Sequence, residues 1–572
     1  MTLSNKFKSG VFSKIKPEVI VAFCFFIAAP IYYHPNIGGE GLRIPNNVIV
    51  WGLACMLILF TSFRVGTASK NLVYPSGFKL VLLFPALVTL SQLLKGFDLS
   101  LSAVFTLLSL LILVLFLLAL FQYEIEQNVV NHILLVIVLS GLMQGLIGIL
   151  QVHYYNPGFH YIPGLEKVSP PPYGFFQQIN NQITYQVTCL IVVFVLVGNG
   201  YLLNRGYLIR ILTLIFVFLA AYLVSSSGSR IGIITLVVSL PLILYGQWPT
   251  TRKTKVALAS VLLMFTFGGA SGYDGLEKVS QKLEISEQSY SSSARLGILL
   301  VSLELLKDAP VNGHGLGSFE SVWQYEKGHY LQQHPEARLI EDYVSHPHNE
   351  FVLWIVESGL IGLIGLLSLL LGIVLAFRSM EKRQISTYLA LLLPIALHSQ
   401  VELPYYTSAI HLFLSSFLIF LVMRENKLSV LPIPSRLTKT LPILTFILFF
   451  VAMKFFSHTF LANREMGFTH TPWNLPIATS SSYYSELAAS IETKSKLHKA
   501  LSAGDQGEVR EFINWGTNAI KAEPSLQLFL FLANAYSSVR DKVGLCKTVT
   551  DGGKIYPNNT QLKTAIKYCT SL

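Results

Sequence analysis

Long apolar runs separated by short polar turns fill most of the first 456 residues. Many of these runs reach the roughly 20 residues that an α-helix needs to cross a bilayer. The pattern therefore predicts an all-α polytopic membrane domain with about 13 transmembrane helices over residues 1–456. The expected spans are 18–34, 47–64, 79–95, 103–121, 131–151, 181–198, 207–224, 231–247, 255–271, 349–377, 386–401, 407–423 and 439–456.

The composition agrees with this class of protein. The 572 residues are 52% hydrophobic and 13% charged, whereas a soluble domain has about twice that charged fraction. The net charge of +11 is typical of cytoplasmic Lys and Arg in a membrane protein, so no nucleic-acid partner is expected. The basic segment Asn5–Pro17 leads into the first span without a convincing small-residue cleavage site.

The basic residues gather on one side of the predicted membrane. The N-terminal segment and its same-side loops contain most of them, while the short opposite loops have only Arg43, Lys95 and Lys167. This asymmetry predicts a cytoplasmic N-terminus, and 13 spans then place the C-terminus outside. The polar stretches that suggest chemistry all fall on the outer face, in the loops 152–180, 225–230, 272–348 and 402–406.

Residues 457–572 are more polar and predict a separate outer domain. The stretches "LQLFLFLANAYSSV" and "NTQLKTAIKYC" have the apolar spacing of helices, with "YPNN" between them. A small array of helical hairpins, in the manner of tetratricopeptide (TPR) repeats, is one interpretation, although no clean 34-residue period is present. Cys546 and Cys569 lie in this region and could pair in an extracytoplasmic compartment.

The stretch "SHPHNEFVLWIVESGLIG" places two histidines and an asparagine at the mouth of the tenth span. On one continuous helix, His348, Gly359 and Gly362 would share a side, because offsets of 11 and 14 return to within about 40°. Imidazole suits proton transfer near neutral pH, so His348 is a candidate base. The alternative is an interfacial histidine that only caps the helix. Glu357 is a further candidate, because carboxyl groups at membrane depth are often functional.

Two arginines follow clusters of small residues. Arg230 ends "SSSGSR" at the start of the eighth span, and Arg295 ends "SSSAR". A guanidinium at a membrane edge needs water, a phosphate or a partner, and ordinary snorkelling to lipid headgroups is the alternative. The glycines Gly313, Gly315 and Gly317 either build an anion-binding wall or simply make a turn.

Amide, carboxylate and aromatic side chains mark two further outer turns. Gln178 and Asn180 open the sixth span in "YGFFQQINNQ" and suit sugar hydroxyls, unless they only cap that helix. In "LHSQVELPYYTS", His398 ends the eleventh span, and Glu402 and Tyr405 belong to the turn that follows. The carboxylate could orient an imidazole or an arginine. Together these groups on one face predict a site for a membrane-embedded, phosphate-bearing lipid.

The motifs resemble those of the O-antigen ligase/polymerase (Wzy_C) superfamily over residues 150–425. "HNEFVLWIVESGLIG" fits the H-[NSQ]-x9-G-x-x-G pattern, and "SSSGSR" and "SSSARLGILL" resemble the two arginine motifs. "APVNGHGLGSF" contains the following P-x-x-G-x-G-x-x-x-F. "HSQVELPYY" and "GFFQQINNQ" resemble H-x3-E-x-P-x-Y and G-x3-Q-x-N of the PglL-type protein O-oligosaccharyltransferases. Ile179 stands where that branch often has proline.

The resemblance implies a GT-C-like glycosyltransferase of the bacterial inner membrane with a periplasmic active site and C-terminus. Its donor would be an undecaprenyl-diphosphate-linked oligosaccharide, transferred en bloc to Ser or Thr of a pilin-like protein. His348 would be the general base, Arg230 and Arg295 would hold the diphosphate, and Glu402 would orient His398, His348 or an arginine.

Sugar or acceptor contacts would come from Gln178, Asn180, Asn349, His398 and Tyr405. Neither a metal nor a cofactor is expected, because no Asp-x-Asp motif occurs on the outer face. Three other functions stay open: an O-antigen ligase that acts on lipid A-core, a glycan polymerase, and a transporter. Polar residues at one face, without an internal repeat, argue against transport.

Overall fold

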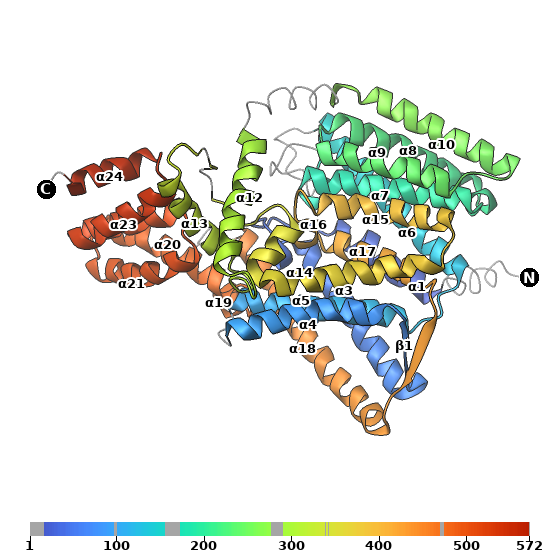
Figure 1. The fold of residues 1–572 in the computed structure, drawn as a ribbon, viewed down its shortest axis with the longest axis horizontal. Coiled ribbons are helices and arrows are strands. Elements are labelled where there is room, and N and C mark those ends of the chain that lie inside the picture. The colour runs from blue at the N-terminus through green and yellow to red at the C-terminus, as the bar shows by residue number, and fades with distance from the viewer. Residues whose placement is uncertain are drawn as a thin grey trace, which may run out of the picture. The chain divides into compact units, whose positions relative to one another are not determined.

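The structure is a computed structural model that describes residues 16–96, 100–154, 172–275, 290–337, 339–340, 343–468 and 474–570. The chain is almost entirely helical over these residues (Figure 1). Strands β1 (Asn71–Pro75) and β2 (Leu428–Pro432) pair antiparallel. The predicted all-α polytopic membrane fold is confirmed. Lys167 and parts of the predicted loops 152–180 and 272–348 lie outside the described residues.

Each predicted span coincides with a helix. Within the described residues, nine helices are long and apolar enough to cross a membrane. Three shorter apolar helices, Pro17–Ile31, Arg230–Gly246 and Ala409–Met423, match the first, eighth and twelfth predicted spans. The eleventh predicted span corresponds to α15 (Lys382–His398).

Contacts divide the chain into two compact units. The first unit comprises Met1–Phe78, Ile112–Lys282 and Ile373–Phe460, and the second comprises Lys79–Leu111, Leu283–Gly372 and Leu461–Leu572. The boundary predicted at residue 456 falls inside α18 (Ser435–Phe468). The C-terminal helices therefore share a compact unit with part of the membrane region, and their separate folding stays a prediction.

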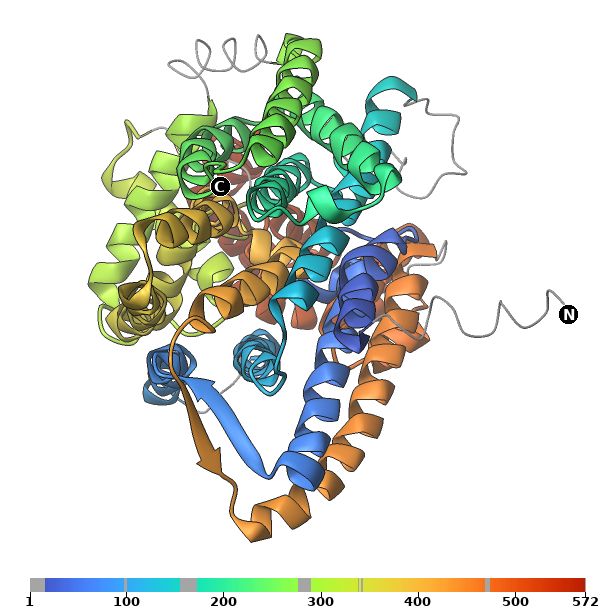
Figure 2. The same cartoon turned by 90° about the vertical axis from the view of Figure 1, so that its right-hand side faces the viewer.

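The first unit is built around one almost fully buried helix, α7 (Ile179–Gly198). In its most apolar 18-residue stretch, 94% of the residues are buried. Glycines allow close packing around it: a side chain on Gly232 would overlap Ile183. Figure 2 shows α18 alongside α3, where a Cβ on Gly52 would come within 3.6 Å of the Phe456 ring. Besides α15 and most of α18, the other helices of this unit are α1 (Pro17–Phe23), α2 (Ala29–Ile31), α3 (Pro45–Arg64), α6 (Gln127–Tyr154), α8 (Tyr207–Ser226), α9 (Arg230–Gly246), α10 (Arg252–Ser271), α16 (Pro404–Thr407) and α17 (Ala409–Met423).

The second unit combines apolar helices with an array of five C-terminal helices, α20 to α24. Its elements are α4 (Phe78–Lys95), α12 (Tyr290–Asp308), α13 (Phe319–Gln333), α14 (Glu350–Ala376), α19 (Pro476–Ser480), α20 (Ser485–Ala503), α21 (Gln506–Ala522), α22 (Leu526–Ser538), α23 (Lys542–Ile555) and α24 (Thr560–Thr570); α5 (Leu101–Leu120) and α14 continue into the first unit. Buried Phe512, Leu528 and Leu532 form one core of the array. A disulfide between Cys546 and Cys569 joins α23 to α24, the pairing that the sequence left open.

Helix α14 is interrupted, which corrects one expectation. Gly359 has φ 61° and ψ −158°, so α14 consists of two helical pieces that meet at this residue. His348 lies before the helix, with a left-handed φ of 54°. The prediction that His348, Gly359 and Gly362 share one side of a continuous helix is therefore wrong. It assumed regular helical geometry on both sides of a glycine that breaks it.

Candidate active site

The break in α14 is bridged by the glycine loop between α12 and α13, residues 309–318. A broken helix frees backbone groups that need partners inside a membrane protein. The loop supplies them through four backbone hydrogen bonds: His314 N to Val356 O (2.9 Å), Gly315 N to Glu357 O (2.9 Å), Leu360 N to Pro310 O (2.9 Å) and Ile361 N to Val311 O (3.1 Å). Ser91 Oγ also donates to the carbonyl oxygens of Asn312 (2.9 Å) and Ser358 (3.0 Å).

This contact explains the glycines of the loop. A Cβ on Gly359 would overlap the Val311 carbonyl oxygen, and one on Gly313 would overlap the backbone of Glu357. Gly313, Gly315 and Gly317 all have positive φ, which glycine adopts without steric cost. The structure thus favours a turn for backbone packing over an anion-binding wall. The loop fixes the helix that begins directly after His348.

His348 and Asn349 stand together at the start of α14. The half-buried His348 ring lies against His346, with ring centroids 4.1 Å apart, and its backbone N donates to His346 Nδ1 at 3.3 Å. Asn349 Oδ1 accepts from Val352 N at 3.0 Å and so caps the helix. A left-handed non-glycine residue is uncommon and often marks a functional site. The geometry thus places a half-buried imidazole beside a capped helix start.

Arg295 belongs to the same unit but to another helix. Its exposed side chain lies on α12, which is joined to α13 by the Trp323 Nε1 bond to Ile298 O at 3.1 Å. Within its unit, an exposed guanidinium on a fixed helix is free to meet an anion such as a phosphate.

In the first unit, the starts of α7 and α9 are tied together. Ser229 caps α9, accepting from Gly232 N at 3.2 Å, and donates its hydroxyl to Asn180 Oδ1 at 2.8 Å. Arg230 is the first residue of α9, and Gln178 is the N-cap residue of α7. Helix N-termini attract anions, and the half-buried Arg230 adds a full positive charge there. Gln178 Oε1 is buried and has no hydrogen-bond partner among the described residues, so it can accept a hydrogen bond from a ligand.

The loop that precedes Gln178 is held by glutamines that the sequence analysis did not single out. Gln151 Oε1 accepts from Tyr173 N (3.0 Å) and Gly174 N (2.7 Å), and Gln151 Nε2 donates to Gly174 O (3.1 Å). Gln144 Oε1 accepts from Phe175 N at 3.1 Å. Amides inside an apolar span were the available signal, because polar groups there need partners.

The turn with Glu402 and Tyr405 is joined to the same helix start. Asn181 Nδ2 donates to Oγ1 of Thr407, the last residue of α16, at 2.9 Å. Asn47, also missed from sequence, donates to Thr407 O at 3.3 Å and accepts from Ala409 N at 2.9 Å. Glu402 on the turn and Tyr405 in α16 are both half-buried.

His398 lies apart from that surface. Its side chain is completely buried, and neither ring nitrogen has a hydrogen-bond partner among the described residues. Glu402 N bonds to the His398 carbonyl oxygen at 3.0 Å, so the two residues are backbone neighbours.

Each unit thus presents part of the predicted chemistry. The first unit brings Arg230, Gln178 and Asn180 together with the turn of Glu402 and Tyr405. The second unit holds His348 beside Asn349 and exposes Arg295. The first set can bind anionic and hydroxyl-rich groups, and the imidazole of the second can accept a proton.

The model of one protein family, described as O-antigen ligase, matches residues 214–367. Residues 214–367, about a quarter of the chain, are thus similar to the O-antigen ligase family. The matched segment contains Arg230, Arg295, His348 and Asn349, together with the glycine loop, and it confirms the superfamily predicted from the motifs. The family implies glycosyl transfer that involves lipid-linked glycans and acceptors. No curated protein matches the chain.

The motifs of the PglL-type branch lie outside the match. Gln178 and Asn180 precede it, and His398, Glu402 and Tyr405 follow it. The match therefore supports the superfamily for residues 214–367 and leaves the branch a prediction.

Proposed function

We propose that this protein is a bacterial O-linked protein oligosaccharyltransferase. It moves a preassembled glycan en bloc from undecaprenyl diphosphate to a Ser or Thr hydroxyl of a periplasmic, pilin-like protein. The observation that supports this branch is the Asn181–Thr407 hydrogen bond. It joins the helix start of "QQINNQ" to the segment "VELPYYT", so that the two branch-type motifs are held next to each other.

The proposed reaction is a single inverting displacement without a metal ion. His348 takes the proton of the acceptor hydroxyl while that oxygen attacks the anomeric carbon. The bond from the anomeric carbon to the diphosphate oxygen breaks, and undecaprenyl diphosphate leaves with the electron pair. Arg230 and Arg295 bind the diphosphate and stabilise its growing negative charge. A general base contributes about 10²–10⁴-fold to such a rate.

The remaining groups set orientation and substrate contacts. Glu402 and the neighbouring Tyr405 shape the turn next to Asn181, while Gln178 and Asn180 offer amide groups to the sugar. Asn349 fixes the helix end beside the base. Glu402 orients the buried His398.

The proposed location is the bacterial inner membrane, with a cytoplasmic N-terminus and a periplasmic active site. The distribution of Lys and Arg supports this orientation. The Cys546–Cys569 disulfide supports it independently, because disulfides persist in oxidising compartments such as the periplasm.

The intact mass of a co-expressed pilin-like protein tests the proposal. The host makes a lipid-linked glycan, lacks its own ligases, and carries wild type, His348→Ala or the control His334→Ala. His334 is an exposed histidine after α13 in the same unit. A glycan-sized mass increase is expected with wild type and His334→Ala and is absent with His348→Ala.

The same strains distinguish the proposed function from a second candidate, O-antigen ligase, which the description of the matching family favours. Glycan on lipid A-core with an unmodified pilin would move the assignment to that ligase. Longer glycans on undecaprenyl diphosphate alone would indicate a polymerase. Full pilin modification by His348→Ala would refute the role of His348 as base.

A further inference from the structure

Helix α13 presents a polar stripe to the chain segment that leads to His348. Glu320, Gln324 and Lys327 are spaced i, i+4 and i+7, so they share one helix face. Gln324 and Lys327 are fully buried. Gln324 Nε2 donates to Val344 O at 3.4 Å, and Lys327 Nζ donates to Ile340 O at 3.4 Å.

Tyr343 completes the attachment of this segment. Its hydroxyl donates to the Glu320 carboxylate. Burial, together with the nearby Glu320 charge, raises the pKa of Tyr343 well above its ordinary value, so the hydroxyl keeps its proton and remains a donor. Three side chains of one helix thus hold Ile340, Tyr343 and Val344, which precede His346 and His348 in the chain.

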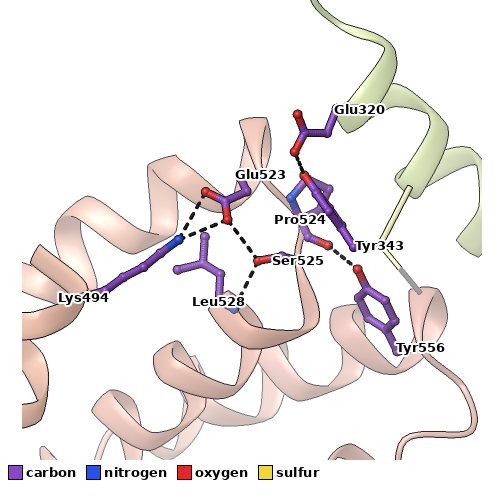
Figure 3. A network of polar contacts seen from close by, with 8 residues as sticks. All are labelled: Glu320, Tyr343, Lys494, Glu523, Pro524, Ser525, Leu528 and Tyr556. Carbon is purple, nitrogen blue, oxygen red and sulfur yellow. Dashed lines mark hydrogen bonds and ion pairs between the residues drawn. The ribbon is translucent and has the colours of Figure 1, made fainter. Parts of the chain in front are cut away.

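The C-terminal array packs against the neighbouring face of α13. Tyr325 OH donates to Ile520 O at 2.9 Å, and a side chain on Gly328 would meet Ile555 at 3.1 Å. Tyr556, between α23 and α24, lies with its ring 4.6 Å from Lys327 Nζ. Figure 3 shows Tyr556 bonded to Pro524 of the array, and Tyr343 bonded to Glu320 of α13.

Lys327 therefore connects the array to the segment before His348. A buried ammonium needs compensating contacts, and besides Trp323 of α13 both elements provide them: the Tyr556 ring at 4.6 Å and the Ile340 carbonyl oxygen at 3.4 Å. Disturbing either contact weakens the position of the other element, because the same charge stabilises both.

We propose that the C-terminal array is a positioning element for the His348 segment, acting through Lys327 and Tyr556. In this role, which rests on the proposed function, the array keeps the imidazole aligned with the acceptor hydroxyl. Lys327, Gln324 and Tyr556 are positioning residues and touch no reacting atom. An array that only recruited the acceptor would instead set the KM for that protein.

Hydrogen exchange of the full-length protein in lipid nanodiscs tests the coupling without any turnover. Lys327→Met keeps most of the side-chain volume and removes the charge. Faster exchange is expected in peptides over residues 343–353, with unchanged exchange in α7. The matched control is Lys542→Met, since Lys542 stands 5.7 Å from the ring of exposed Tyr568 in the same array. It should leave residues 343–353 unchanged.

Transfer kinetics distinguish a misplaced base, which lowers kcat, from weaker substrate binding, which raises KM. Lys327→Met should lower kcat about 10–100-fold, the cost expected for a misplaced catalytic group, with KM for donor and acceptor within about twofold. Lys542→Met should match wild type. A raised acceptor KM with unchanged kcat and unchanged exchange would overturn the positioning role in favour of recruitment.

Two substitutions at Tyr556 keep the test valid if Lys327→Met does not fold. Tyr556→Phe keeps the ring over Lys327 and loses only the hydrogen bond to Pro524 O, whereas Tyr556→Leu removes the ring. Faster exchange over 343–353 is expected for leucine and not for phenylalanine. Equal exchange in both would refute the role of the ring.

The two proposals fail in different ways. Altered exchange in Lys327→Met, with no transferase activity in wild type on any acceptor, would disprove the proposed function and leave the structural coupling intact. Pilin transfer by wild type with unaltered exchange and kcat in Lys327→Met would disprove the positioning element alone.

Discussion

The two units position their candidate site residues by different means. In the first unit, side-chain amides hold the turns: Gln151 binds the loop before Gln178, and Asn181 binds the turn after Glu402. In the second unit, backbone groups of the glycine loop bridge the break at Gly359. The first design depends on hydrogen-bonding side chains, whereas the second depends on the absence of side chains.

This difference predicts which substitutions each unit tolerates. A lost amide leaves a few buried backbone groups unpaired, which costs about 1–3 kcal/mol for each group. An added methyl group in the glycine contact has no space and separates two chain segments. The second unit should therefore show the larger single-residue effects.

The largest effect is expected for Gly359→Ala. Alanine at φ 61° is strained, and its Cβ overlaps the Val311 carbonyl oxygen, so all four bridging hydrogen bonds are disturbed. The loss of stability should reach about 4–5 kcal/mol, the range of severe single substitutions. Thermal unfolding of the purified protein measures it. Gly145→Ala in α6 is the control, since its Cβ would meet nothing closer than 3.7 Å. Equal melting temperatures for the two variants would contradict the close backbone contact.

Gln151→Leu should have the next largest effect. It removes three hydrogen bonds to Tyr173 and Gly174 and leaves three backbone groups unpaired, which predicts a loss of about 3 kcal/mol at the low end of the cost per group. The same substitution at Gln127 is the control, because this glutamine lies exposed on the same helix. Its effect should stay within about 0.5 kcal/mol. Similar melting curves for both variants would mean that the loop does not need the amide.

The sequence predicted the helices well because apolar length and basic asymmetry are local signals. It did not predict the break at Gly359, since "ESGLIG" is equally typical of two helices that pack closely through glycine. The break depends on a contact with residues 310–315, a distant part of the chain. Such tertiary partners cannot be inferred from one apolar run.

The site residues were predicted by their chemistry, and their supports were missed. Arg230 and His348 stand out because a charged or titratable group next to an apolar span needs water, a phosphate or a partner. Gln151 and Asn47 did not stand out, because single amides within apolar spans follow no spacing rule. Their partners are backbone groups of loops, and such bonds appear only when the loop conformation is known.

A smaller effect is expected where α7 meets α9. Asn180→Leu loses the bond from Ser229 Oγ, and Asn180→Asp keeps an acceptor for it. A double-mutant cycle with Ser229→Ala should give a coupling of about 1 kcal/mol for the Asn–Ser pair. Because Arg230 follows Ser229, Asn180→Leu should also raise the KM for the lipid-linked donor, whereas Asn180→Asp should restore the stability. A coupling near zero would show that the Asn180–Ser229 bond does not stabilise the contact between the two helix starts.

The smallest effect on stability is expected for the cap at Asn349. Asn349→Ala removes the acceptor for Val352 N and should cost about 1 kcal/mol, whereas Asn349→Ser retains a capping oxygen and most of the stability. Unfolding and glycan transfer, measured on the same two variants, separate the roles proposed for this residue. If the side chain only caps α14, serine restores both properties. If it also contacts the sugar or the acceptor, serine restores stability while transfer stays low, because the shorter hydroxyl cannot replace the amide on both sides at once.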